Sequence, residues 1–276
     1  MRPLQPALTP LEFLKGYASL FLRSLKASFA YRATTVTSLL TATVAYAIPM
    51  LVWRQVYAQN PSGLHISQAQ MFPYLLLACC VNYSLGMSVE FRISQRIRMG
   101  LIATDLLKPL DFQVAQGVQS VSDGLFNGAL GMTVFFCGYL FLGPEVFPAG
   151  WEAFGLFILS YLLAFLVMYG ICFVFVQGAF YTYSGYGILT ARMALQYTFS
   201  GMSAPLTLYP AFLGTIGRRL PFQHTIFTPV SIYMGWVQGQ QAWHLIGEQA
   251  LWVLALFLLG KILMNQALKQ LEIQGG

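Results

Sequence analysis

The chain alternates long apolar runs with short, more polar connections. Six runs are long enough to cross roughly 30 Å of hydrocarbon as helices, at about 20 residues each. These predicted spans are residues 33–53, 71–89, 118–142, 153–181, 193–213 and 243–264. Pro205 and Pro210 interrupt the fifth run, so we expect its outer half to be kinked or unwound. The pattern predicts an all-α integral membrane protein with six transmembrane helices.

The first thirty residues carry the pattern of an amphipathic helix over 10–30. Thr9 is a good N-cap, Pro10 suits the first helical position, and Glu12 completes a capping box. On a helical wheel, one narrow sector holds the polar residues Glu12, Lys15, Ser19, Arg23 and Lys26. A mostly apolar helix with a narrow basic stripe is typical of a helix lying on an anionic membrane surface. We therefore predict an N-terminal interfacial helix in contact with lipid; the alternative is packing on the apolar surface of a partner.

Two connecting segments are unusual. Segment 90–116 alternates basic and apolar residues, then has a glycine and a short amphipathic stretch ended by Pro109. Segment 214–242 is apolar and is punctuated by prolines and glycines. The latter predicts external re-entrant or interfacial helices before the last span. The alternative is a sixth span that begins earlier in the sequence.

Composition excludes the soluble classes. Hydrophobic residues make up 57% of the chain and charged residues only 9%, and the mean hydropathy is +0.63. A soluble enzyme could not solvate its surface with so few charges, and a disordered chain would be poor in apolar residues. The four cysteines lie within apolar runs, which favours small buried or lipid-facing side chains over a disulfide framework. The three histidines are scattered along the sequence, so a metal site is not expected.

The charge distribution predicts the orientation. If the N-terminus is cytoplasmic, the inner segments carry twelve of the fifteen Lys and Arg residues. The inner residues are Arg2, Lys15, Arg23, Lys26, Arg32, Arg92, Arg96, Arg98, Lys108, Arg192, Lys261 and Lys269. We therefore expect a multi-pass protein of the cell (inner or plasma) membrane with both termini in the cytoplasm. The net charge of +6 then reflects topology, and no nucleic-acid partner is expected.

No catalytic constellation is present. The sequence contains no phosphate loop of the form G-x-x-x-x-G-K-[ST], no H-E-x-x-H and no G-x-S-x-G. The chain is therefore not expected to be an enzyme or to hold a cofactor of its own. Asp123 and Glu248 fall near span boundaries, where an interface anchor is the favoured interpretation of each.

Neutral polar residues recur within the predicted spans. They could hold helices together, which is the favoured interpretation, or line a path for an amphipathic solute. The residues of this candidate path are Thr34, Ser38, Thr41, Asn82, Tyr83, Gln196, Tyr197 and Ser200.

Two short motifs resemble a known family. Residues 96–110, RIRMGLIATDLLKPL, resemble the "I-R-x-G … L-L-[KR]-P-L" stretch of ABC-2 type permeases, in the branch called ABC-2 family transporter protein. Leu220-Pro221-Phe222, followed by Pro229 and Gly235, is similar to the branch's "P-F … P … G" segment before the last span. The resemblance covers nearly the whole chain as one transmembrane domain, 1–276.

The resemblance implies that a separate subunit supplies the energy for transport. A permease of this family has no ATPase of its own, so ATP and Mg would sit on separate ABC ATPase subunits. A second permease subunit, identical or different, would complete the assembly. The resemblance favours export of an amphipathic, drug-like or lipid-like compound by alternating access.

The motif at 96–110 would then be a cytoplasmic coupling helix that receives the motion of the ATPase. Gly100 permits a sharp turn, Ile102, Leu106 and Leu107 give an apolar face, and Pro109 ends the helix. The predicted coupling residues are Arg96, Arg98, Gly100, Ile102, Asp105, Leu106, Leu107, Lys108 and Pro109. Rival interpretations are a self-contained channel or secondary carrier, and an intramembrane enzyme.

Overall fold

The computed structural model describes residues 10–30, 32–59, 65–86, 88–182 and 185–270, with side chains except at 29, 30, 32–36, 38, 39, 42 and 270. Within these ranges the chain forms helices and turns and no strand, which confirms the all-α prediction. The α-helices are α1 Pro10–Ala30, α2 Arg32–Gln59, α3 Gln68–Ser84, α4 Val89–Arg98, α5 Ile102–Leu106, α6 Phe112–Leu142, α7 Trp151–Val176, α8 Ala179–Thr182, α9 Gly185–Phe199, α10 Ala211–Arg219, α11 Phe227–Tyr233 and α12 Gly239–Ala267. Short 3₁₀ turns are η1 Gly143–Val146, η2 Leu206–Leu208, η3 Pro221–His224 and η4 Leu268–Gln270.

Four helical stretches of the described chain are long and apolar enough to cross a membrane. They are Gln68–Arg98, Phe112–Val146, Trp151–Thr182 and Gly239–Ala267. These stretches contain the second, third, fourth and sixth spans predicted from the sequence. The first predicted span, 33–53, lies within α2, several of whose side chains are outside the described set.

The fifth predicted span, 193–213, is not one continuous helix. Helix α9 ends at Phe199, and Gly201 follows in the left-handed region with φ of 83°. The break therefore begins before Pro205, earlier than the prolines alone indicated. A Cβ atom on residue 201 would lie 2.8 Å from the Tyr74 hydroxyl and 2.9 Å from Cβ of Phe227, so the backbone here is tightly enclosed.

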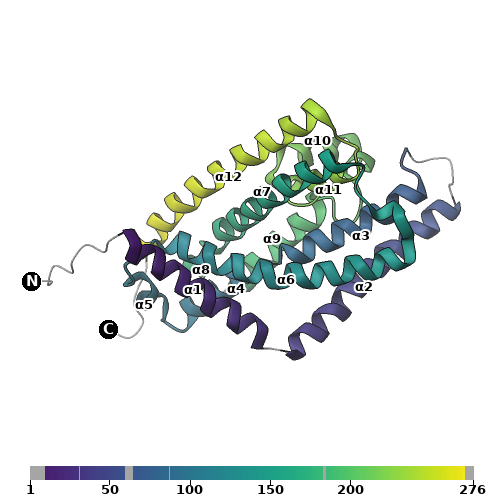
Figure 1. Ribbon diagram of the computed structural model, residues 1–276. Helices are drawn as coiled ribbons and strands as arrows, with labels where there is room; N and C mark the ends of the chain where they lie inside the picture. The colour runs from purple at the N-terminus through teal and green to yellow at the C-terminus, as the bar shows by residue number, and fades with distance from the viewer. Residues whose placement is uncertain (1–9, 31, 60–64, 87, 183–184, 271–276) are drawn as a thin grey trace, which may run out of the picture.

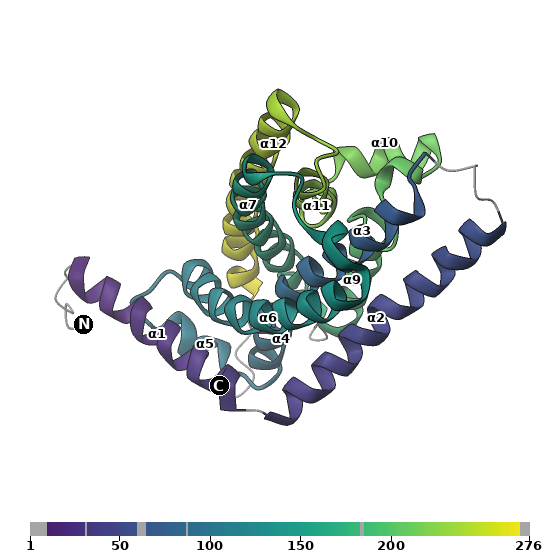
Figure 2. The same cartoon turned by 45° about the vertical axis from the view of Figure 1, so that its right-hand side comes forward.

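Helix α7 lies beside α12, and both α3 and α1 lie against α6 (Figures 1 and 2). Figure 1 places the start of α1, the short α5 and the end of α12 at the same end of the molecule. Two contacts of Asp111, the residue just before α6, support this placement. The Lys261 ammonium of α12 lies 3.7 Å from the Asp111 carboxylate, and the Asp111 amide donates to the Tyr17 hydroxyl of α1 at 3.2 Å.

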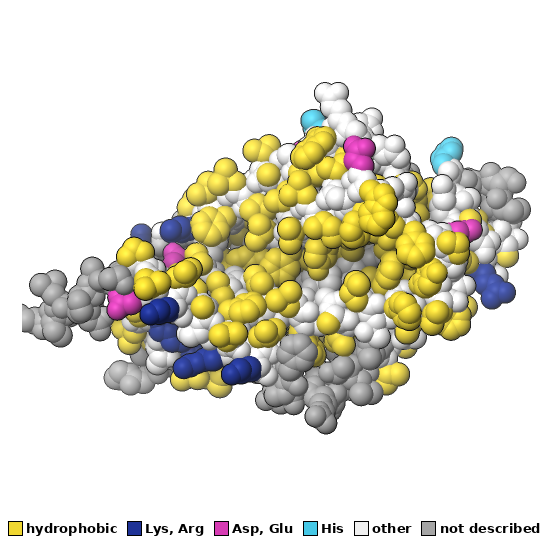
Figure 3. All heavy atoms as spheres, in the orientation of Figure 1, with side chains coloured by type: hydrophobic (Ala, Val, Ile, Leu, Met, Phe, Trp, Pro, Cys, Tyr) yellow, Lys and Arg dark blue, Asp and Glu magenta, His cyan; other side chains and the backbone are white. Residues whose placement is uncertain are grey.

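Apolar side chains cover the middle of the face seen in Figure 3, whereas Lys and Arg side chains gather at the end where α1 begins. This banding is the surface expected of a protein that meets hydrocarbon around its waist and headgroups at its ends. Together with the four apolar helical stretches, it indicates a multi-pass membrane protein.

Glycines on one side of α6 allow close packing against α3. A Cβ at Gly131 would lie 3.0 Å from the Cys80 carbonyl oxygen, and one at Gly138 would clash with the Leu76 side chain. Small residues at such positions let membrane helices approach closely enough for extensive dispersion contact. The glycines of α6 therefore set the spacing of the α3–α6 pair.

Helix α1 packs on the chain's own α6 through one face. The Ser122 hydroxyl of α6 donates to the Phe21 carbonyl at 3.0 Å, and Gly16 sits beside Leu110. Leu11, Leu14 and Leu22 remain exposed on α1. Contact with a membrane surface thus stays a prediction for the remaining faces, and the predicted N-cap Thr9 lies outside the described residues.

Candidate functional site

Segment 90–116, predicted as a connecting loop that contains one short helix, is instead mostly helical. It begins inside α4 and ends inside α6, which starts at Phe112, six residues before the predicted span 118–142. Polar residues of this region are buried rather than solvated. Glu90 of α4 and Gln113 and Gln116 of α6 are all buried.

Gly100 forms the turn between α4 and α5. Its φ of 68° is left-handed, and no atom lies within 4 Å of a Cβ built there. The Leu101 amide donates to the Arg96 carbonyl at 2.9 Å, and the Gly100 amide donates to the Ile97 carbonyl at 3.0 Å. This pair of bonds is the Schellman motif, for which glycine is favoured. The turn that the sequence predicted here is therefore the C-cap of α4. Glycine is favoured at residue 100 by the left-handed backbone conformation, and not by a lack of room for a side chain.

The predicted apolar face of the coupling helix is divided between the core and the surface, which corrects the sequence interpretation. Ile102 is 3% exposed and Leu106 packs on the core, whereas Leu107 is 81% exposed. Ile102 and Leu106 are four residues apart and share a helix face, while Leu107 is one residue further on and points elsewhere. The exposed apolar residues at this turn are instead Met99, Leu101 and Leu107.

Most of the charges predicted to contact a partner are paired inside the chain. The Asp105 carboxylate accepts hydrogen bonds from Arg96 Nε and, at 2.7 Å, from Lys108 Nζ. Arg98 is exposed and forms no ion pair with the part of the chain that the structure describes. Pro109 is exposed and follows the end of α5.

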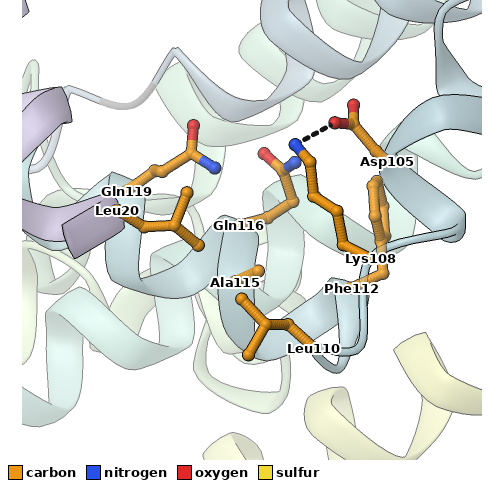
Figure 4. Close-up of a pocket in the computed structure, with 8 residues that line it drawn as sticks. All are labelled: Leu20, Asp105, Lys108, Leu110, Phe112, Ala115, Gln116 and Gln119. Atoms are coloured by element: carbon orange, nitrogen blue, oxygen red, sulfur yellow. Dashed lines mark hydrogen bonds and ion pairs between the residues drawn. The ribbon is translucent and has the colours of Figure 1, made fainter. Parts of the chain in front are cut away.

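A small cavity of about 20 Å³ lies between α1, α5 and the start of α6 (Figure 4). In Figure 4 the ion-paired Lys108 and Asp105 lie on one side of the cavity, and Leu20 of α1 lies on the other. The Gln116 Oε1 atom is buried and has no hydrogen-bond partner among the described residues. A cavity of this size has room for about one water molecule, so it cannot be the site of a transported compound.

The candidate path residues lie on separate elements, and several are engaged by the chain itself. The Thr41 hydroxyl donates to the Thr37 carbonyl at 2.8 Å, and Gln196 Nε2 donates to the Thr225 hydroxyl at 2.7 Å. The Ser200 hydroxyl accepts from the Met202 amide at 3.3 Å. These contacts are of the kind that holds helices and turns in place.

The other path candidates divide by exposure. Asn82 and Tyr83 of α3 are half-buried, and Tyr197 of α9 is exposed. The side chains of Thr34 and Ser38 lie outside the described set. A continuous path through these residues remains a prediction.

The two boundary carboxylates both lie close to basic side chains. Asp123 of α6 accepts from the Ser88 hydroxyl at 2.6 Å and pairs with Arg92 of α4. Glu248 of α12 lies 3.3 Å from His244 Nδ1 and 3.7 Å from His224 Nε2. Asp123 therefore links two helices, a role beyond that of an interface anchor.

Sequence reasoning missed one feature of this region, the ion pair between Glu90 of α4 and Arg192 of α9. Arg192 Nε and Nη2 donate to the two Glu90 carboxylate oxygens at 3.0 and 2.9 Å, and both side chains are buried. The residues are 102 positions apart, so no local spacing could have revealed the pair. The sequence analysis places Arg192 on the cytoplasmic side because of its charge, and Glu90 is the first residue of segment 90–116.

The segment between α9 and α12 is largely buried. Residues 221–226 and 228–233, which form η3 and most of α11, are buried among other helices. Helices α11 and α12 are separated by a turn in which Gly235 and Gly239 have φ of 71° and 53°. The structure thus contains a distinct short helix before α12, and its depth in a membrane stays a prediction.

The four helical stretches that can cross a membrane make this a multi-pass membrane protein. A family model described as ABC-2 family transporter protein matches residues 74–275. The match covers well over half of the chain, from α3 to beyond α12, and the chain therefore belongs to the ABC-2 transporter family. Comparison with curated proteins finds no match.

Family membership confirms the resemblance seen in the two sequence motifs. It makes the chain a membrane (permease) subunit of the ABC transporter type, which associates with an ABC ATPase subunit.

Proposed function

We propose that the chain is the permease subunit of an ATP-driven exporter that moves an amphipathic, drug-like or lipid-like compound outward by alternating access. The observation that carries the proposal is the turn around α5. It presents exposed apolar residues on a rigid base at the end of the molecule where the basic residues gather.

The exposed part of this turn suits a soluble partner. Met99, Leu101 and Leu107 are 58%, 40% and 81% exposed, and Arg98 lies next to them in sequence. An apolar patch rimmed by polar groups is typical of a protein–protein contact. We name Arg98, Met99, Leu101 and Leu107 the docking patch and propose that it contacts the ATPase subunit.

The contacts beneath the docking patch hold the turn firmly to α4 and to the core. Ile102 is embedded in the core, and Asp105 joins the end of α4 to the chain after α5 through Arg96 and Lys108. A displacement of the docking patch would therefore move α4 as well. This rigidity is what a subunit without its own ATPase needs.

The remaining features of the proposal follow from charge and family. Both termini and the docking patch would face the cytoplasm, because Lys and Arg favour that side. Helices α2 and α9 would supply the first and fifth of six spans. A second permease subunit, the same or different, would complete the path, and ATP and Mg would be bound on the ATPase.

Co-purification tests the docking patch. Leu107→Asp places a charge in the patch without disturbing the core, whereas Leu106→Asp would also disrupt packing. We expect Leu107→Asp and Arg98→Glu to lose most of the associated ATPase. Thr104→Asp, at an exposed polar position of α5, should retain it.

Full ATPase recovery with Leu107→Asp and Arg98→Glu would contradict the docking patch. Uphill solute movement by the purified chain alone in liposomes would instead favour a secondary carrier.

A further inference from the structure

The ion pair between Glu90 and Arg192 is the most deeply buried pair of charges in the described chain. The Arg192 and Glu90 side chains are 8% and 4% exposed, and two parallel hydrogen bonds join them. Cys172 of α7 lies beside the pair. Bidentate pairing of this kind fixes the orientation as well as the distance of the two helices.

Helix α9 is attached to the rest of the described chain mainly through polar side chains. Its buried residues are Arg192 and Gln196, one helical turn apart. Gln196 is bonded to Thr225 at 2.7 Å, and the partly buried Ile188 and Phe199 add apolar contact near the two ends. Exposed apolar residues of α9 include Tyr186, Met193, Leu195 and Tyr197. Removing the pair would therefore take away one of the two polar links of α9.

The other end of this link is a short helix with three polar connections. Helix α4 reaches α9 through Glu90, α6 through Arg92 and α5 through Arg96. Arg92 pairs with Asp123, and Arg96 with Asp105. One ten-residue helix thus connects the base of the docking patch with α9.

Stability alone gives little reason to place a pair of charges here. Desolvating two ions is costly, and well-packed apolar replacements are often as stable or more stable. Ionisable residues within membrane helices are functional candidates for the same reason.

We propose that Glu90 and Arg192 are positioning residues through which movement of α4 and α5 reaches α9 during transport. The inference rests on the proposed function, because it assumes that an ATPase acts on the docking patch.

The test follows two reporters in the ATPase complex, co-purified and placed in lipid nanodiscs. Exposed Cys137 is changed to Ser, and a spin label is attached to Thr104→Cys on α5 or to Thr198→Cys on α9. Both positions are exposed and lie outside the docking patch and the ion pair. Spectra are recorded before and after ATP and orthovanadate are added.

We expect both reporters to respond in the parent protein. In Glu90→Gln the α5 reporter should still respond, and the α9 response should fall severalfold. Asp123→Asn is the matched control, because it breaks the link from α4 to α6 and leaves the link to α9 intact. The α9 response should persist in this control.

A second variant guards against misfolding. Glu90→Gln combined with Arg192→Met removes both charges, so no buried charge is left unpaired. We expect it to fold like the parent and to lose the α9 response. A merely structural pair would leave this variant folded and fully responsive, and that result overturns the inference. If the α5 reporter is silent in the parent, the proposed function itself fails.

Discussion

The hydroxyl of Tyr74 in α3 donates a hydrogen bond of 2.5 Å to the carbonyl of Gly201, directly after the end of α9. Tyr74 is fully buried and stacks on Trp236, with ring centroids 5.2 Å apart. The Trp53 indole of α2 donates to the Ser203 carbonyl at 2.9 Å, and the Phe227 amide donates to the Ser200 carbonyl at 2.9 Å. Side chains and backbone from three elements thus donate hydrogen bonds to the carbonyl groups of this non-helical segment, which lipid could not do.

Removing the Tyr74 hydroxyl should destabilise the chain. We expect Tyr74→Phe to lower the free energy of unfolding by about 1–2 kcal/mol, because the Gly201 carbonyl loses its donor in a buried site. Thermal unfolding in detergent measures the loss, and Tyr197→Phe at an exposed position of α9 is the control. Equal midpoints for the two variants would show that the bond contributes nothing.

Adding a methyl group to the α3–α6 contact should also be costly. Gly131→Ala places a Cβ 3.0 Å from the Cys80 carbonyl oxygen, which belongs to backbone and cannot move aside alone. We expect a loss of about 1–3 kcal/mol, the usual range for overpacking. Gly155→Ala on α7 is the control, since no atom lies within 4 Å of its Cβ. The idea of a close contact fails if the two variants unfold at the same temperature.

Neutralising Asp105 should loosen the turn around α5 without unfolding the protein. Asp105→Asn leaves Arg96 and Lys108 without their shared carboxylate. We expect trypsin to cut after Arg98 severalfold faster, while the thermal midpoint changes little, because partly exposed ion pairs contribute modestly to stability. Glu152→Gln, at an exposed position on α7, should not change the cleavage rate. An unchanged rate in Asp105→Asn would mean that apolar packing alone holds α5.

Labelling of intact cells tests the orientation. With Cys137 changed to Ser, a cysteine at Gln59 should react with a membrane-impermeant maleimide, and one at Thr104 should react only after lysis. Both positions are exposed, so protein packing does not protect either. The reverse pattern would invert the topology.

Local sequence patterns correctly predicted the structural features that depend on residues close together in the sequence. Gly100 interrupts a helical pattern after basic residues, and it forms the predicted turn because only glycine adopts that φ without strain. The apolar runs over α3, α6, α7 and α12 likewise predicted four long helices. Each of these features depends on residues within a few turns of one another.

Patterns failed where tertiary contacts decide. The spacing of the apolar residues placed Ile102 and Leu107 on the same short helix. It could not show that Ile102 packs into the core of the chain itself, which leaves only Leu107 exposed. The Glu90–Arg192 pair depends on how α4 meets α9, and α9 ends early because Gly201 is enclosed by Tyr74 and Phe227. A single sequence contains no signal for such distant partners.

The length of α4 limits how its attachments can behave. Ten residues span about 15 Å at 1.5 Å per residue. A tilt of about 10° would shift one end by roughly 2.6 Å, beyond the reach of a hydrogen bond near 2.9 Å. Such a tilt must either carry α9 along or separate the two charges completely.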